Sequence, residues 1–290
     1  MLAATRMELE QLLADDVPFG DLTTDALGIG DCAGEMAFFA RDPMVVAEAE
    51  SAAAILEIIG CRVSLATQSG SALAAGALIL TAAGPASALH RGWKVAQTLI
   101  EVWSGVATAA RAIVDAAAAV SQDVTVACTR KNVPGAKSYA ARAVKAGGAT
   151  VHRLGLSETV LVFPEHRVFL GPESISEAAN RLRRLAPEKK LVIEVTSVED
   201  AVKAADARFD VIQTEKFAPA QVAALGELLR ARPARPLIAA AGGINVGNAA
   251  AYAGSGANIL VTSAPYLGRP CDVQVKLTST GAAAGAFKTP

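Results

Sequence analysis

The second half of the chain alternates short apolar runs with helical stretches, and this alternation limits the fold more than any other feature. The runs are rich in Val, Ile, Leu and Ala, and a segment of helical periodicity separates most of them. Strands that are apolar throughout are typical of parallel sheets covered on both faces. The sequence predicts strands at 124–128, 159–163, 191–195, 210–214, 237–241 and 258–262. It predicts helices at 136–146, 173–185, 198–207, 219–230 and 246–253.

An open doubly wound sheet and a closed barrel both fit this pattern. Polar residues of functional types recur where successive predicted strands end. Barrel enzymes place their sites at the carboxyl ends of the strands, so this placement favours an α/β barrel. A length of 290 residues leaves room for a second, smaller domain.

The first hundred residues follow a mixed pattern that predicts a small α+β domain. Helices are expected at 5–14 and 49–59, and strands at 36–40, 44–47 and 78–82. Another helix contains Trp93, and we expect Ser104-Gly105 to interrupt it before it resumes over 107–120. Residues 273–277 alternate apolar and polar side chains, which is typical of a strand returning to the first domain.

Two basic clusters stand beside predicted strands. Thr129-Arg130-Lys131 follows the run that ends at Cys128, and His152-Arg153 precedes the run that begins at Thr159. The net charge is only −1, so cations gathered at strand ends indicate a focused pocket for an anion. Salt bridges to neighbouring acids are an equally good explanation from the sequence alone.

Acidic residues and a glycine pair end other predicted strands. Glu194 and Glu215 lie at two strand ends, and Gly242-Gly243 lies between a strand and a helix. A glycine turn before a helix exposes backbone N–H groups that can bind phosphate. The two carboxylates suit Mg²⁺ held by a pyrophosphate, or ribose hydroxyls, although they would serve equally as counter-charges for the basic clusters.

Composition and charge exclude several other classes of protein. Near-neutral charge without a long Lys or Arg run argues against a nucleic-acid surface. The 4 cysteines and 3 histidines lack zinc-ligand spacing. The first residues lack the apolar core of a signal peptide, and the uncharged stretch at 236–268 is too broken by polar and glycine residues to cross a membrane. We therefore expect a cytoplasmic protein with no membrane insertion.

Taken in order, several motifs resemble those of the quinolinate phosphoribosyltransferase (nicotinate-nucleotide pyrophosphorylase) family. They are Gly20-Asp21-x-Thr23-Thr24, Ser104-Gly105-Val106-Ala107-Thr108, Thr129-Arg130-Lys131-x-x-Pro134-Gly135, Gly147-Gly148, His152-Arg153-x-Gly155-Leu156 and Gly242-Gly243-Ile244-Asn245. The likeness covers nearly the whole chain. Residues 90–97 and 152–159 are most similar to ModD, the branch of this family associated with molybdenum transport.

The resemblance implies a two-domain enzyme. Residues 1–106 would form an α/β sandwich, residues 107–268 an α/β barrel, and residues 269–290 a tail that returns to the first domain. It also implies a homodimer in which the partner subunit's first domain completes each site. The family transfers phosphoribose from phosphoribosyl pyrophosphate to a pyridine nitrogen and releases pyrophosphate. Mg²⁺ and fixed cations would stabilise the charge that develops on the sugar and the leaving group.

Carried over position by position, the resemblance assigns roles to particular residues. Catalytic roles fall to Lys131, Glu194 and Glu215, and the two glutamates would also hold Mg²⁺ through the pyrophosphate. Substrate would be bound by Lys94, Thr129, Arg130, Lys131, His152, Arg153 and Phe163. Phosphate would be bound by Ala241, Gly242, Gly243, Thr262, Ser263 and Ala264.

Some of these positions depart from the family pattern. Lys94 replaces an arginine, Phe163 a lysine and Glu215 an aspartate, and the segment 262–264 lacks its usual central glycine. Lysine cannot reproduce the planar, bidentate grip of arginine on a carboxylate, and Phe163 removes a cation. We therefore expect phosphoribosyl transfer to an acceptor other than quinolinate. The alternative is a non-catalytic module that binds an anion or a pterin-like ligand in molybdenum handling.

Overall fold

The computed structural model describes residues 4–171, 173–230, 232 and 234–281. By their contacts the residues form two compact units. The N-terminal unit comprises the chain up to Ala109, Val133–Gly148 and the residues from Leu267 onward; the barrel unit comprises Ala110–Asn132 and Ala149–Tyr266. Residues 282–290 of the predicted tail lie outside the described residues.

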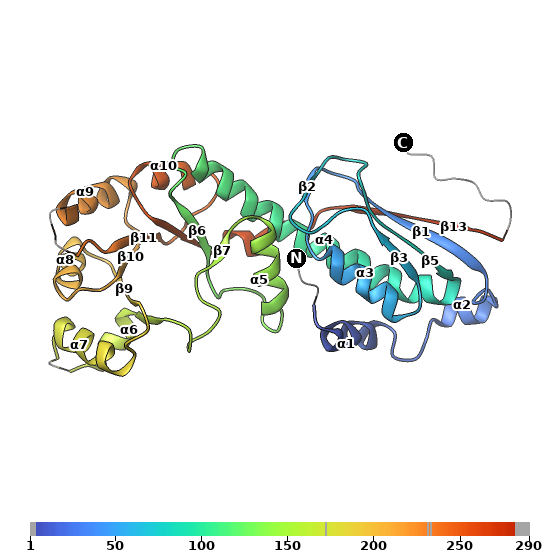
Figure 1. Cartoon of the computed structure of the whole chain (residues 1–290), viewed down its shortest axis with the longest axis horizontal. Helices are drawn as coiled ribbons and strands as arrows, with labels where there is room; N and C mark the ends of the chain where they lie inside the picture. Colours follow the sequence, from blue (N-terminus) through green and yellow to red (C-terminus); the bar gives the residue numbers. More distant parts are fainter. Residues whose placement is uncertain (1–3, 172, 231, 233, 282–290) are drawn as a thin grey trace. The chain divides into compact units, whose positions relative to one another are not determined.

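The N-terminal unit is built on an antiparallel sheet in the order β13-β1-β5-β3 (Figure 1). The alternating tail segment forms β13 and pairs with β1, so that Met36 faces Leu277 across the two strands. Helix α3 packs against β3 and β5. The elements of this unit, with helix α4 running on into the barrel unit, are α1 (Arg6–Asp16), α2 (Leu22–Leu27), β1 (Ala33–Ala40), β2 (Met44–Val45), α3 (Ala49–Ile58), β3 (Arg62–Leu65), β4 (Ala72–Leu73), β5 (Leu78–Pro85), α4 (Ala86–Ala118), α5 (Lys137–Ala146) and β13 (Val273–Ser279).

Helix α4 runs without a break over 33 residues, so the interruption expected at Ser104-Gly105 is wrong. The hydroxyl of Ser104 accepts a hydrogen bond from the backbone N–H of Ala47 at 2.9 Å. A Cβ on Gly105 would lie 2.2 Å from the carbonyl oxygen of Arg269. The glycine is present because another segment of backbone crosses the helix there, and a helix tolerates one glycine at a modest cost.

The barrel unit contains a parallel sheet of 7 strands in the order β7-β6-β12-β11-β10-β9-β8 (Figure 1). The α/β barrel expected from the sequence is confirmed as a curled half-barrel, since β7 and β8 form the two ends of the sheet. Its elements are β6 (Thr125–Cys128), β7 (Thr150–Val151), β8 (Val160–Val162), α6 (Pro164–Arg167), α7 (Ile175–Leu185), β9 (Leu191–Val195), α8 (Val198–Asp206), β10 (Val211–Glu215), α9 (Pro219–Arg230), β11 (Leu237–Ala241), α10 (Ala249–Gly254), β12 (Ile259–Thr262) and the 3₁₀ turn Ala264–Leu267.

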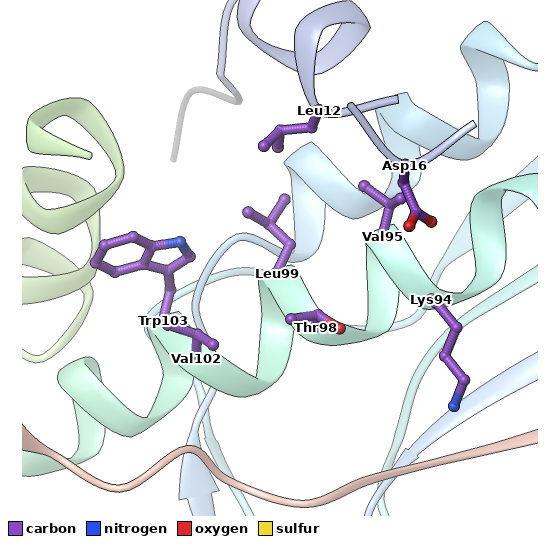
Figure 2. A pocket seen from close by; sticks show the side chains of 8 residues that line it. All are labelled: Leu12, Asp16, Lys94, Val95, Thr98, Leu99, Val102 and Trp103. Carbon is purple, nitrogen blue, oxygen red and sulfur yellow. The ribbon is translucent and has the colours of Figure 1, made fainter. Parts of the chain in front are cut away.

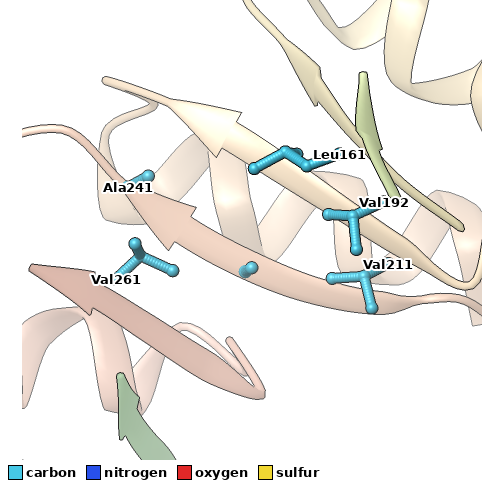
Figure 3. Close-up of a cluster of buried hydrophobic side chains, with 6 residues drawn as sticks. Leu161, Val192, Val211, Ala241 and Val261 are labelled. Carbon is cyan, nitrogen blue, oxygen red and sulfur yellow. The ribbon is translucent and has the colours of Figure 1, made fainter. Parts of the chain in front are cut away.

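Small apolar side chains fill the inside of the curled sheet. They are Leu161, Val192, Val211, Ala239, Ala241 and Val261 (Figure 3). Because side chains alternate along a strand, Glu194 and Gln213 lie on the same face of β9 and β10 as Val192 and Val211, nearer the carboxyl ends. The apolar cluster therefore forms the base on which polar side chains are placed.

Within the described part of the chain, no helix is both long enough and apolar enough to cross a membrane.

Candidate active site

The parallel sheet brings almost all of the predicted site residues to one edge. Each lies at or just beyond the carboxyl end of its strand, and neighbouring parallel strands end on the same side. The sets are Thr129, Arg130 and Lys131 after β6, His152 and Arg153 after β7, Phe163 after β8, Glu194 in β9, Glu215 in β10, Ala241, Gly242 and Gly243 at β11, and Thr262, Ser263 and Ala264 at β12.

The turn that carries the first basic cluster is fixed by the neighbouring strand β12. The N–H of Thr129 donates to the carbonyl of Thr262 at 2.8 Å, and its own carbonyl accepts from the hydroxyl of Tyr266 at 2.8 Å. The Thr129 hydroxyl accepts from the N–H of Lys131 at 3.2 Å. This leaves Arg130 and Lys131 exposed at the edge of the sheet on a well-supported backbone. No motif or period in the sequence pointed to Tyr266.

The second basic cluster continues the pairing of β7 with β6, since the N–H of His152 donates to the carbonyl of Cys128 at 2.9 Å. Burial and the charge of Arg153 lower the pKa of His152, which favours a neutral imidazole. Arg153 is only 7% exposed, and both its burial and the charge of Arg130 lower its pKa. Cys128 is a buried thiol whose pKa is raised to about 12 by burial, so it is not activated as a nucleophile.

Salt bridging does not account for these cations. Among the described residues, no ion pair within 4.0 Å involves Arg130, Lys131 or Arg153. Lys131 does act on the acidic side of the site at longer range, because its charge lowers the pKa of Glu194. Two neighbouring arginines, one of them buried and neither paired with an acid among the described residues, could together bind an anionic ligand.

Phe163 forms an aromatic wall at the end of β8. Its ring stacks on His166 with centroids 5.9 Å apart, and the guanidinium carbon of Arg153 lies 5.5 Å from the ring centroid. The ring also packs against the apolar cluster inside the sheet. The position thus offers a flat apolar surface beside a cation.

Glu194 and Glu215 form the acidic side of the site. Burial and the charge of Glu215 raise the pKa of Glu194, while a hydrogen bond from Gln213 and the charge of Lys131 lower it. Nε2 of Gln213 donates to Oε2 of Glu194 at 2.6 Å. Gln213 was not among the predicted site residues, although the period of two along β10 places it on the same face as Glu215.

The turn at Gly242-Gly243 needs glycine at its first position. Both residues have positive φ, 91° and 83°. A Cβ on Gly242 would lie 2.6 Å from Cγ of Lys216 and 3.0 Å from Oε1 of Glu215. The side-chain amides of Asn245 and Asn248, which sequence reasoning did not select, both donate to the carbonyl of Gly243 at 3.0 Å.

The last predicted phosphate-binding segment is held partly by its own threonine. The hydroxyl of Thr262 donates to the carbonyl of Ile244 at 2.6 Å and accepts from the N–H of Ala264 at 3.0 Å. These hydrogen bonds use the buried Thr262 side chain, which is 3% exposed, to hold the two adjoining loops. Ser263, the next residue, is half-buried and therefore more accessible to a ligand.

Lys94 alone among the predicted site residues belongs to the N-terminal unit. It stands on α4 at the edge of a groove of about 340 Å³ that also contains Leu12, Leu99 and Trp103 (Figure 2). Its ammonium group lies 4.3 Å from the ring centroid of Trp93 and 3.2 Å from Oε1 of Gln97.

Comparison with known proteins shows which family this chain matches. The family model "Quinolinate phosphoribosyl transferase, C-terminal domain" matches residues 106–276, and the corresponding N-terminal domain matches residues 21–104. A putative pyrophosphorylase ModD from Rhodobacter capsulatus is 50% identical over 242 residues, which cover 83% of this chain and 93% of that protein. The protein of the same description from Escherichia coli O6:H1 is 36% identical over 278 residues and covers 96% of this chain and 98% of its own length.

A solved structure shows the same fold. The crystal structure of NadC from Streptococcus pyogenes matches with a TM-score of 0.88 at 23% identity, covering 96% of this chain and 99% of that one.

Proposed function

Since this chain belongs to the quinolinate phosphoribosyltransferase family and is a phosphoribosyltransferase-type enzyme, we propose that it transfers phosphoribose to a nitrogen heterocycle other than quinolinate. Phosphoribosyl pyrophosphate would be the donor, and pyrophosphate the leaving group. The observation that carries the proposal is that Arg130 and Arg153, which form no ion pair among the described residues, lie on the same edge of the sheet as Glu194 and the Gly242-Gly243 turn.

Two parts of the site suit the two ends of the donor. Backbone N–H groups in glycine turns bind phosphate, which fits Gly242-Gly243 to the phosphate of the donor. Lys131 and Arg130 are exposed cations that can stabilise the charge on departing pyrophosphate. We assign Thr129 and His152 to the positioning of substrate between these groups.

The acidic side fits a magnesium ion that is shared with pyrophosphate. Burial and the charge of Glu215 raise the pKa of Glu194, and a bound cation would offset the repulsion between the two carboxylates. Among the described residues, no group of three or more potential ligands of the His, Cys, Asp or Glu type could hold a metal alone. Glu194 and Glu215 would therefore hold Mg²⁺ through the pyrophosphate, where the ion would neutralise the leaving group.

Phe163 is the reason to propose a different acceptor. Quinolinate carries two carboxylates, and the site presents an aromatic face where the family resemblance implies a lysine. A hydrogen bond between a charged donor and a carboxylate contributes about 1.5–3 kcal/mol, and Phe163 cannot make one. The stack of Phe163 beside Arg153 suits a flat heterocycle with a single anionic group.

We also propose that the protein is a cytoplasmic homodimer in which Lys94 of one subunit completes the site of the other. The groove beside Lys94 and exposed apolar side chains such as Phe19 and Phe169, 98% and 88% exposed, support a further contact surface. A link to molybdenum uptake or use is proposed from the likeness to the ModD proteins alone. Light scattering tests the dimer, and the molybdenum content of cells lacking the gene tests the link.

Turnover measurements test the function directly. We expect the purified protein, given Mg²⁺ and phosphoribosyl pyrophosphate, to release pyrophosphate with a monocarboxylate heterocycle such as nicotinate faster than with quinolinate. Efficient conversion of quinolinate to nicotinate mononucleotide with loss of carbon dioxide would refute the altered acceptor. Calorimetry that detects no binding of phosphoribosyl pyrophosphate would refute the donor.

A further inference from the structure

Gln213 is a buried polar side chain beneath the acidic side of the site. It is 4% exposed and stands on β10 directly opposite Glu194 on β9. Its Nε2 donates to Oε2 of Glu194 at 2.6 Å, whereas its Oε1 is buried without a hydrogen-bond partner. Such an unpaired carbonyl oxygen is uncommon in a protein interior and calls for an explanation.

The hydrogen bond from Nε2 to Glu194 accounts for the orientation of the amide. If the amide turned over, its carbonyl oxygen would face the carboxylate, and the two acceptors would repel each other. The observed orientation therefore keeps the bond to the charged group and leaves the neutral oxygen unsatisfied. Val192 and Val211 lie on the same faces of β9 and β10, so an apolar side chain would also fit at position 213. Such a side chain would leave no unsatisfied oxygen.

The bond also decides which atom of Glu194 is available. With Oε2 held by Gln213, Oε1 has no hydrogen-bond partner among the described residues. The like charge of Glu215 opposes the ionised form of Glu194, and the amide N–H supports it. A carboxylate held through one oxygen presents the other at a fixed position.

We propose that Gln213 is a positioning residue, which fixes the Glu194 carboxylate so that Oε1 meets the magnesium–pyrophosphate group or a ribose hydroxyl of the donor. The inference rests on the proposed function, because it needs the donor to bind at this edge of the sheet. Groups that orient the ligands of a metal commonly change affinity 10- to 100-fold when they are removed.

Calorimetry with phosphoribosyl pyrophosphate and Mg²⁺ tests the inference in Gln213→Leu and Gln213→Met. We expect both variants to bind the donor at least about tenfold more weakly while melting at or above the wild-type temperature. The control is Thr214→Val, on the same strand, whose hydroxyl donates to the carbonyl of Ala239 at 3.4 Å. It is expected to keep wild-type affinity.

A double variant, Glu194→Gln with Gln213→Glu, separates positioning from pairing. It keeps a carboxylate–amide pair but moves the charge to the other strand, so we expect a melting temperature close to that of the wild type and a donor affinity that stays low. Three results would overturn the inference. They are recovery of donor affinity in the double variant, wild-type affinity in both Gln213→Leu and Gln213→Met, and weakened binding that occurs only together with a lower melting temperature. Failure of the wild-type protein to bind the donor would overturn the proposed function as well, so the two failures are distinguishable.

Discussion

Replacing Phe163 by lysine is expected to give the site a capacity for quinolinate. The new ammonium group would add a charged hydrogen bond to the second carboxylate, worth about 1.5–3 kcal/mol, or about 10- to 150-fold in affinity. Without ligand, the same ammonium would stand near Arg153, whose guanidinium carbon lies 5.5 Å from the present ring centroid. Two like charges at that separation repel by roughly 1–3 kcal/mol near a protein surface. Phe163→Lys is therefore expected to lower stability in the free protein and to recover it when quinolinate binds.

The assay is the ratio kcat/KM for quinolinate, with thermal melting measured with and without that ligand. Phe163→Met serves as the matched control, because it also removes the ring from the apolar cluster but adds no charge. We expect a rise of about tenfold or more in kcat/KM only in the lysine variant. Equal values in the two variants would refute the argument that a missing cation at this position sets the acceptor.

Three further predictions concern buried charge and backbone strain. Arg142→Met should lower the free energy of unfolding in urea by about 3–5 kcal/mol, because the buried Glu48 carboxylate loses the arginine that lies 2.7 Å from it. A loss below about 1 kcal/mol would contradict this. Burial raises the pKa of Glu48 above its ordinary 4.5, so the folded state binds the proton more tightly than the unfolded state. The contribution of Glu48 to stability should be fully present below about pH 4.5 and be lost as the pH rises through the raised pKa. Glu48→Gln should abolish this dependence, and an equal slope of unfolding free energy against pH in the two proteins would contradict it. Gly242→Ala should weaken donor binding at least about tenfold in calorimetry, since φ is 91° and the new Cβ would lie 2.6 Å from Cγ of Lys216. Unchanged affinity would show that the donor does not bind at this turn.

Local pattern was enough to predict the barrel and the edge of the sheet at which the candidate site residues gather. Parallel strands buried on both faces must be apolar throughout, and their carboxyl ends must meet, so Glu194 and the turn at Gly242 could be placed together from the sequence. Helix α9 (Pro219–Arg230) has the bounds that its periodicity predicts. Strand β7 (Thr150–Val151) was not predicted because two residues are too few to show a period.

Contacts between distant segments could not be predicted in this way. Helix α5 lies between barrel strands in the sequence, yet it belongs to the N-terminal unit, where Arg142 pairs with Glu48 and Tyr139 stacks on Trp103 at 5.8 Å. An amphipathic helix shows which face is buried but not against what. Gly105 was misread for the same reason, because the backbone that crosses it is far away in the sequence.

The fold class, the family and the residue types that gather at one edge of the sheet could all be read from the amino-acid sequence, because they depend on periodicity and on ordered motifs. Three features of the site required the three-dimensional structure. Among the described residues Arg130 and Arg153 have no acidic partner, the ring of Phe163 stacks on His166 and lies near Arg153, and Gln213 holds Glu194. Charge pairing and hydrogen bonding depend on distances of a few ångströms between separate strands, and no local pattern encodes those distances.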